Sequence, residues 1–163
     1  MTETEKLLAI EEIKKVFARR VRYMDTQQWD KYGSVHTEDA YSETYGDLPD
    51  DKQPTADGKK NTVAGPEALA AMIKNFITID PPITSVHHAH QPEIEFTSDT
   101  TATGIWPMED HLWWKNGDDE EFLHGYGHYH ERYRKVDGQW LICYRKLTRL
   151  KVEVTPNFFD RLD

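Results

Sequence analysis

The chain has 163 residues, of which 37% are hydrophobic and 30% charged, a composition typical of one globular domain. Its formal net charge of −9 argues against a nucleic-acid-binding role, because phosphate binding depends on a basic face. Cys143 is the single cysteine, which excludes an intramolecular disulfide and favours a reducing compartment. The sequence shows neither a signal-peptide pattern nor the ~18 uninterrupted apolar residues of a membrane span. We therefore expect a single cytoplasmic domain over residues 1–163, without nucleic-acid or membrane partners.

The first part of the sequence has the apolar spacing of helices. Apolar residues recur every three or four positions from Leu7 to Met24, which predicts an amphipathic first helix over about residues 4–25. We expect a short second helix just after Asp25. Residues 39–46 are typical of a strand.

A polar segment with several prolines and charges, residues 47–60, predicts a mobile loop that is too short to link two domains. Pro66 suits the first turn of a third helix, which we expect to run through Phe76. The pair Pro81 and Pro82 stops any longer helix.

The second half of the chain is predicted to form β-strands. Alternating apolar and polar residues occupy four segments: residues 86–96, 101–114, 122–136 and 139–154. Asn116-Gly117 and Asp137-Gly138 are strong hairpin signals. Long consecutive strands joined by tight turns pair antiparallel, because parallel strands need crossover segments. The sequence predicts an α+β fold: a cone-shaped barrel in which a curved antiparallel sheet packs on three N-terminal helices around one apolar pocket.

Six of the eight histidines lie on two of the predicted strands, residues 86–96 and 122–136. Alternate side chains of a strand share a face, so His88 and His90 point one way and His87 the other. His128 shares its face with His124, and one face of this strand should look into the cone, which makes His128 a candidate substrate contact. A neutral imidazole can bind a metal, but no suitably spaced carboxylate follows in the same strand. We expect no metal site.

Three short segments carry a resemblance to a known family through their order and spacing. They are Met24–Asp30, the pair His87 and His88 ahead of Pro92, and Tyr133–Trp140. With this order and spacing, the chain resembles the SnoaL-like branch of the nuclear-transport-factor-two-like superfamily over about residues 10–154. This branch includes scytalone dehydratase, hexachlorocyclohexane dehydrochlorinase, bile-acid dehydratase and polyketide cyclases. The superfamily also contains ketosteroid isomerases and non-catalytic binding modules, so fold membership alone does not assign a function.

The resemblance implies three catalytic residues. In the dehydratases and the dehydrochlorinase, a buried aspartate at the end of the first helix pairs with a histidine that begins the central strand. Asp25 and His87 fall on these two positions, and Arg145 matches a functional arginine of the dehydrochlorinase. Where scytalone dehydratase presents a serine and an asparagine, this chain has Gly127 and Tyr129, so we expect a different substrate.

The chemistry of these side chains agrees with that implication. Elimination beside an acidic C–H needs a base that titrates near the working pH, and imidazole meets this condition. A carboxylate bonded to the other ring nitrogen fixes the tautomer and stabilises the imidazolium, so Asp25 would orient His87. A tyrosine or Arg145 would stabilise the developing oxyanion. Two structural alternatives remain: Asp25 can cap a helix boundary, and Arg145 can pair with Glu131 or another acid.

Further pocket residues are expected among the aromatic and apolar side chains. The candidate substrate contacts are Tyr23, Tyr41, Tyr45, Phe76, Trp106, Met108 and Tyr129. Aromatic residues on strands are otherwise favoured by packing in the core or at interfaces. We expect Glu109 and Asp110 at the surface or in a subunit contact. In the tail, residues 155–163, Phe158 and Phe159 should cap the pocket or dock on another subunit.

The expected function is a cofactor-independent, dehydratase-like lyase that acts on a hydrophobic small molecule, which can be polycyclic. An isomerase or polyketide-cyclase-like enzyme with the same base is the first alternative. The second alternative is a non-catalytic small-ligand-binding module. The relatives lead us to expect a homo-oligomer, either a dimer or a trimer.

Overall fold

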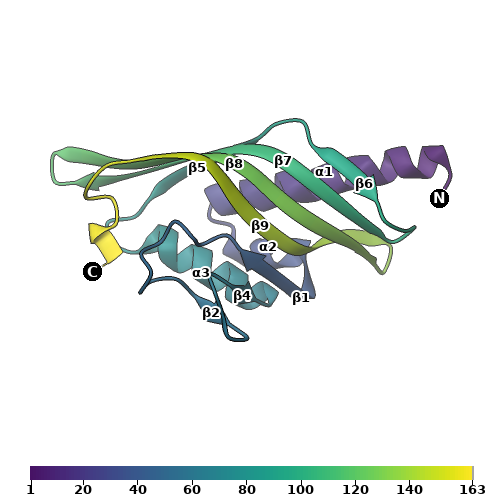
Figure 1. The fold of residues 1–163 in the computed structure, drawn as a ribbon, viewed down its shortest axis with the longest axis horizontal. Helices are drawn as coiled ribbons and strands as arrows, with labels where there is room; N and C mark the ends of the chain where they lie inside the picture. Colours follow the sequence, from purple (N-terminus) through teal and green to yellow (C-terminus); the bar gives the residue numbers. More distant parts are fainter. Residues whose placement is uncertain (163) are drawn as a thin grey trace.

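The computed structural model describes residues 1–162 and consists of three α-helices and a large curved sheet (Figure 1). Helix α1 spans Glu3–Asp25, α2 spans Trp29–Tyr32 and α3 spans Pro66–Thr78, with a 3₁₀ turn, η1, over Gly33–Val35. The strands are β1 (His36–Glu43), β2 (Thr55–Ala56), β3 (Lys59–Lys60), β4 (Val63–Ala64), β5 (Thr84–Ala89), β6 (Glu93–Phe96), β7 (Thr101–Asn116), β8 (Asp119–Val136) and β9 (Gln139–Val154). This arrangement confirms the α+β cone.

The sheet is built around the meander β7–β8–β9. Its strand order is β4-β1-β9-β8-β7-β5, and β6 pairs with β7 beside β5. Every pair is antiparallel except β1 and β9, which are parallel, so the sheet is mixed. The parallel pair arises because β1 reaches the free edge of β9 from far away in the sequence, and no tight turn sets its direction.

Both predicted hairpins are confirmed. Asn116 pairs with Asp119 across a two-residue loop in which Gly117 has φ 63°. Val136 pairs with Gln139 across Asp137 and Gly138, which have φ 49° and 81°. Positive φ angles at these positions define the primed turns, whose twist matches that of the flanking strands.

The boundaries of several elements differ from the expected ones. Strand β1 begins at His36 and ends at Glu43, and part of segment 47–60 forms the short β2–β3 hairpin. The expected strand 86–96 is divided into β5 and β6, because Pro92 lacks the N–H that a continuous ladder would need.

The tail is anchored by two buried side chains, those of Phe158 and Arg161. Phe158 is buried in the core below α3, and its carbonyl accepts a hydrogen bond of 3.0 Å from the indole N–H of Trp114. Phe159 only packs against this cluster, and a 3₁₀ turn, η2, follows over Asp160–Leu162. Asp163, the last residue of the expected tail, lies outside the described residues.

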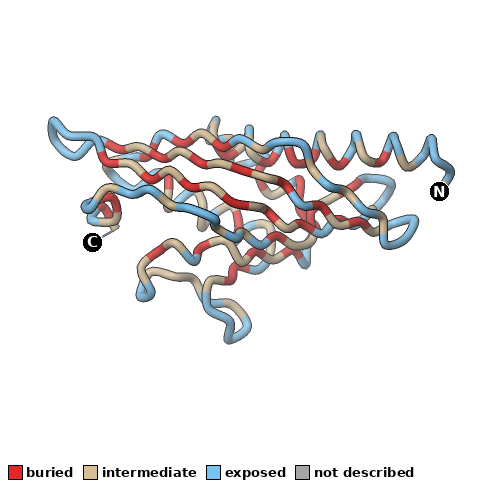
Figure 2. Tube along the Cα trace, turned by 45° about the horizontal axis from the view of Figure 1, so that its top comes forward, coloured by how far each residue is buried: buried red, intermediate tan, exposed pale blue. Residues whose placement is uncertain are grey.

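Helix α1 packs one face against the concave side of the sheet. Buried and exposed residues alternate along the helix and along each long strand, as Figure 2 shows. The inward positions of α1 are Ala9, Ile13, Val16, Phe17, Arg20 and Met24. The ring of Phe17 stacks on Trp106 of β7 with ring centroids 3.9 Å apart, so these two side chains form the centre of this contact. No helix within residues 1–162 is long and apolar enough to span a bilayer.

The stacked pair gives a stability prediction. Phe17→Ala removes the ring that holds α1 on the sheet and should lower the free energy of unfolding by about 3–5 kcal/mol, measured by chemical denaturation. Leu8→Ala is the control on the same helix, because Leu8 is 61% exposed, and it should change stability by less than about 0.5 kcal/mol. Equal effects of the two changes would contradict the packing described for α1.

Candidate active site

Asp25 and His87 form a direct pair at the end of α1. Nδ1 of His87 lies 2.7 Å from Oδ1 of Asp25, and the backbone N–H of His87 donates to Oδ2 at 2.8 Å. The hydroxyl of Ser85 donates to Oδ1 at 2.9 Å. A carboxylate oxygen only accepts, so Nδ1 of His87 is the donor in this contact, and in the neutral ring Nε2 has the free lone pair.

The local sequence places these groups against each other. Helix α1 ends at Asp25, and Gln27 turns the chain away with φ 55°. On β5, Ser85 and His87 are alternate residues on the buried face, so both point toward the end of α1. The carboxylate of Asp25 therefore binds β5, which differs from the helix-capping alternative.

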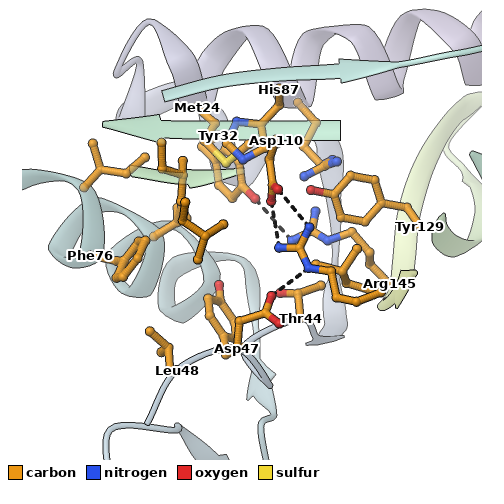
Figure 3. A pocket seen from close by; sticks show the side chains of 18 residues that line it. Met24, Tyr32, Thr44, Asp47, Leu48, Phe76, His87, Asp110, Tyr129 and Arg145 are labelled. Carbon is orange, nitrogen blue, oxygen red and sulfur yellow. Dashed lines mark hydrogen bonds and ion pairs between the residues drawn. The ribbon is translucent and has the colours of Figure 1, made fainter. Parts of the chain in front are cut away.

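The imidazole of His87 lines a pocket of about 80 Å³ between the sheet and α3. Figure 3 shows His87, Asp110, Tyr129 and Arg145 converging on this space, with Phe76 on the opposite side. The apolar part of the wall comes from α1, α3, the loop after β1, and strands β7, β8 and β9: Met24, Leu48, Ile73, Phe76, Ile77, Leu112, Leu123 and Leu147. The pocket thus joins an apolar wall to a polar one.

Two of the three arginines that line the pocket are held by carboxylates. Arg149 forms a bidentate ion pair with Asp110, with both N–O distances at 2.8 Å, and its Nε lies 2.7 Å from Asp47. Arg20 is 1% exposed, and its Nε lies 3.6 Å from the carboxylate of Glu131. Bidentate pairing fixes the position of Arg149 as well as its charge.

Arg145 has a different environment. It is 4% exposed, and its Nη2 donates to the hydroxyls of Tyr32 at 3.3 Å and Ser42 at 3.5 Å. Glu131, which sequence reasoning offered as a partner, instead lies beside Arg20 and accepts a short hydrogen bond from Tyr133. The guanidinium of Arg145 is therefore held by neutral groups.

The two buried arginines change the protonation of their neighbours. Burial raises the pKa of Tyr32, but the positive charges of Arg145 and Arg20 outweigh burial and leave this pKa below its usual value. Burial, together with the same two charges, lowers the pKa of His36 to about 3. His36 is thus neutral at physiological pH, and its Nδ1–H can donate to the carbonyl of Tyr32 at 3.0 Å.

The structure brings together some of the residues named from sequence. His87, Arg145, Tyr45, Phe76 and Tyr129 line the pocket, and Asp25 holds His87 from behind. The others do not line this pocket: Tyr23, Tyr41, Trp106, Met108 and His128.

The position of each of these residues has a physical reason. Trp106 and Met108 are buried in the core beneath α1, and Tyr23 lines a separate hollow beside Val16. Tyr41 packs against Tyr144 with the two rings tilted and their centroids 4.8 Å apart, away from the pocket. His128 lies on the outer face of β8, because its neighbours Gly127 and Tyr129 hold the buried positions.

Sequence reasoning missed Arg20, Tyr32, Ser85, Asp110 and Arg149. Asp110 was expected at the surface but is 4% exposed, because it shares the buried face of β7 with Met108 and Leu112. For two of these residues the sequence contained a signal of a buried charge. Asp110 and Arg20 occupy core positions in otherwise apolar strand and helix patterns, and such residues require a buried partner.

Within residues 1–162, no group of three or more His, Cys, Asp or Glu side chains is arranged to hold a metal ion. His111 and His124 approach each other on the outer face of the sheet, with ring centroids 4.5 Å apart, but they form part of an aromatic stripe with Trp113.

The Arg149–Asp110 pair depends on a glycine. A Cβ atom at Gly125 would overlap with Nη1 of Arg149 and Oδ1 of Asp110, so Gly125→Ala should separate the pair. We expect a loss of about 1–3 kcal/mol in the free energy of unfolding, measured in urea. Gly33→Ala is the control, because its Cβ would meet only Pro66 at an ordinary 3.5 Å and Gly33 is helical. The account of the pair is wrong if both variants are equally stable.

The buried neutral His36 predicts a pH dependence of stability. In the unfolded chain His36 has the usual pKa of ~6.5. Between about pH 6.5 and 3, His36 is therefore protonated more in the unfolded state than in the native state. The free energy of unfolding therefore falls as pH decreases through this window. His36→Asn keeps a donor for the Tyr32 carbonyl but cannot titrate. From pH 7 to pH 5, the wild type should lose about 1–2 kcal/mol more than this variant, whereas equal losses would refute the prediction.

Comparison with known proteins places the chain in a family. The sequence profile of the SnoaL-like domain matches residues 5–146. The structure is similar to a hexachlorocyclohexane dehydrochlorinase (LinA) Type2, with a TM-score of 0.76 and 17% identity over 94% of this chain and 93% of that one. It is also similar to a provisionally named scytalone dehydratase from Novosphingobium aromaticivorans, with a TM-score of 0.72 and 19% identity over 95% and 92% of the two chains.

A third similar structure is ActVI-ORFA from Streptomyces coelicolor, with a TM-score of 0.65 and 16% identity over 87% of this chain and 97% of that one. At these identities the solved structures establish a shared fold, and the domain match covers most of the chain. The protein belongs to the SnoaL-like domain family.

Proposed function

We propose that the protein is a dehydratase-like lyase that eliminates water or a similar group from a small hydrophobic substrate. The observation that carries the proposal is the 2.7 Å contact between Nδ1 of His87 and Asp25 at the wall of a buried pocket. A carboxylate in this position leaves Nε2 free to accept a proton and stabilises the imidazolium that results. The similarity in fold to a dehydrochlorinase and a scytalone dehydratase adds support.

In the proposed reaction, Nε2 of His87 removes a proton from a carbon next to an electron-withdrawing group. The electrons of that C–H bond form a C=C bond, and the bond to the leaving hydroxyl or halide breaks. The proton remains on His87 until water or the leaving group takes it. Each of these steps uses side chains of the chain itself, so the proposal includes no cofactor.

Negative charge that develops on the substrate needs a donor in the pocket. Arg145 meets this need, because it lines the pocket and its buried Nε and Nη1 have no hydrogen-bond partner within the described chain. The hydroxyl of Tyr32 lies 3.3 Å from Nη2 of Arg145 and is an additional donor. Donors that are already in place cost little reorganisation during the reaction, which is the basis of oxyanion stabilisation.

The size of the pocket limits the substrate. Its volume of about 80 Å³ lies below the roughly 300–1,000 Å³ of typical ligand sites, so a single ring fits this conformation better than a polycyclic molecule. Leu48 and Phe76 also line a neighbouring hollow of about 180 Å³. A larger substrate would have to displace these two side chains and join the two spaces.

Two other functions use the same pocket. An isomerase or cyclase would use His87 as the same base without losing water or halide, and a binding module would hold a ligand without turnover. The paired and oriented imidazole favours an enzyme over a binding module, because a ligand site does not need a fixed histidine tautomer. Deuterium exchange into a ketone without loss of water would favour the isomerase.

The test is a substrate screen with matched variants. Hydroxylated steroids, polyketides and halogenated rings would be incubated with wild type, His87→Ala and His88→Ala. Loss of water or halide would be followed by the appearance of the unsaturated product. His87→Ala should reduce turnover by about 10²–10⁴-fold, because it removes the base. His88 follows in sequence but lies exposed on the outer face, so His88→Ala should retain wild-type rates. Turnover that survives His87→Ala would refute the base role.

A further inference from the structure

The guanidinium of Arg145 is a buried cation without a carboxylate. No Asp or Glu oxygen lies within 4.0 Å of it in residues 1–162, and its Nε and Nη1 make no hydrogen bond there. Its two partners, Tyr32 and Ser42, are neutral hydroxyls at 3.3 and 3.5 Å. Because an unpaired buried charge is costly, such an arrangement calls for a negative group that the described part of the chain does not supply.

The nearby carboxylates are already engaged. Asp110 forms two bonds of 2.8 Å with Arg149, and Asp47 binds the same guanidinium at 2.7 Å. Glu131 lies beside Arg20 and accepts a hydrogen bond from Tyr133. Among the three arginines that line the pocket, Arg20 and Arg149 have these carboxylate partners, and Arg145 has none within residues 1–162.

A second cation stands close to Arg145. Both guanidiniums face the ring of Tyr129, Arg20 at 4.7 Å and Arg145 at 5.8 Å from its centroid. Arg20 also has buried groups without a hydrogen-bond partner, Nε and Nη2, among the described residues. Both arginines line the same pocket. The positive charges of Arg145 and Arg20 also lower the pKa of Tyr32 and, together with burial, that of His36.

We propose that the pocket binds its substrate as an anion, with a carboxylate or a similarly small acidic group seated on Arg145 and Arg20. Guanidinium groups match carboxylates in geometry and hold them by charge-assisted hydrogen bonds. The apolar wall formed by Ile73, Phe76 and Leu112 would take the rest of the molecule, and His87 would face it. The substrate class is therefore a small carboxylic acid with an apolar body. This inference rests on the proposed function only in taking the pocket as the substrate site.

Matched ligands separate ground-state binding of an anion from stabilisation of charge that appears during the reaction. The probes are propionate with propionamide and benzoate with benzamide, which differ in charge but hardly in shape. Titration calorimetry at pH 7 should give at least about tenfold tighter binding of the carboxylate in one or both pairs. Equal affinity of acid and amide in both pairs, or no binding of either acid, would overturn the proposal.

Variants then assign the effect to the arginine. Arg145→Gln should weaken carboxylate binding by about 30-fold or more and change amide binding by less than about threefold. Arg134→Gln is the control for net charge, because Arg134 is an exposed residue that pairs with Asp39, and it should retain the carboxylate preference. If Arg145→Gln does not fold, Arg145→Lys replaces it and should lose part of the preference, since lysine cannot form the bidentate contact. A preference unchanged in the folded variant would contradict the proposal.

A further variant separates this inference from the proposed catalysis. His87→Ala removes the proposed base but leaves Arg145 and Arg20 in place, so it should keep the preference for the carboxylate over the amide. Loss of turnover in His87→Ala without any carboxylate preference in the wild type would refute the anion site and leave the lyase proposal standing. A clear carboxylate preference with turnover that does not depend on His87 would refute the base role of His87 and support the anion site.

Discussion

The site depends on one interaction, the contact between the carboxylate at the end of α1 and the buried face of β5. Asp25 accepts hydrogen bonds from the backbone and the ring of His87 and from Ser85, so the helix end and the edge strand have a fixed relative position. A carboxylate that is partly buried needs such donors, because it loses contact with water. The same three hydrogen bonds thus hold the end of α1 against β5 and orient the imidazole of His87.

The general fold could be predicted because it follows from local rules. The apolar period of α1, Pro66 at the start of α3 and the two primed turns all act over a few residues, and each was found where expected. The site was less predictable, since side-chain direction depends on register. Tyr133 pairs with Ile142 and Arg132 with Tyr144, so a bulge at Cys143 reverses the alternation of β9.

This bulge explains why strand period alone would have misplaced the key arginine. Trp140 and Ile142 are buried, and strict alternation would bury Tyr144 and expose Arg145, but Arg145 is the buried residue. Only the resemblance to a known family identified it. The alternation of β8 gave no such warning for His128, because either face of that strand was compatible with its sequence. The charged partners Arg20 and Asp110 were visible as polar residues in apolar patterns but were not interpreted in that way.

The central claim is that Asp25 fixes His87 as the tautomer with a proton on Nδ1 and a free Nε2. The most direct measurement is the ¹⁵N NMR spectrum of histidine-labelled protein, with His87 assigned by comparison with His87→Gln and recorded where the ring is neutral. The account predicts a protonated, hydrogen-bonded Nδ1 and an unprotonated Nε2, and a loss of this preference in Asp25→Asn. A proton on Nε2 in the wild type, or a spectrum that Asp25→Asn leaves unchanged, would contradict it.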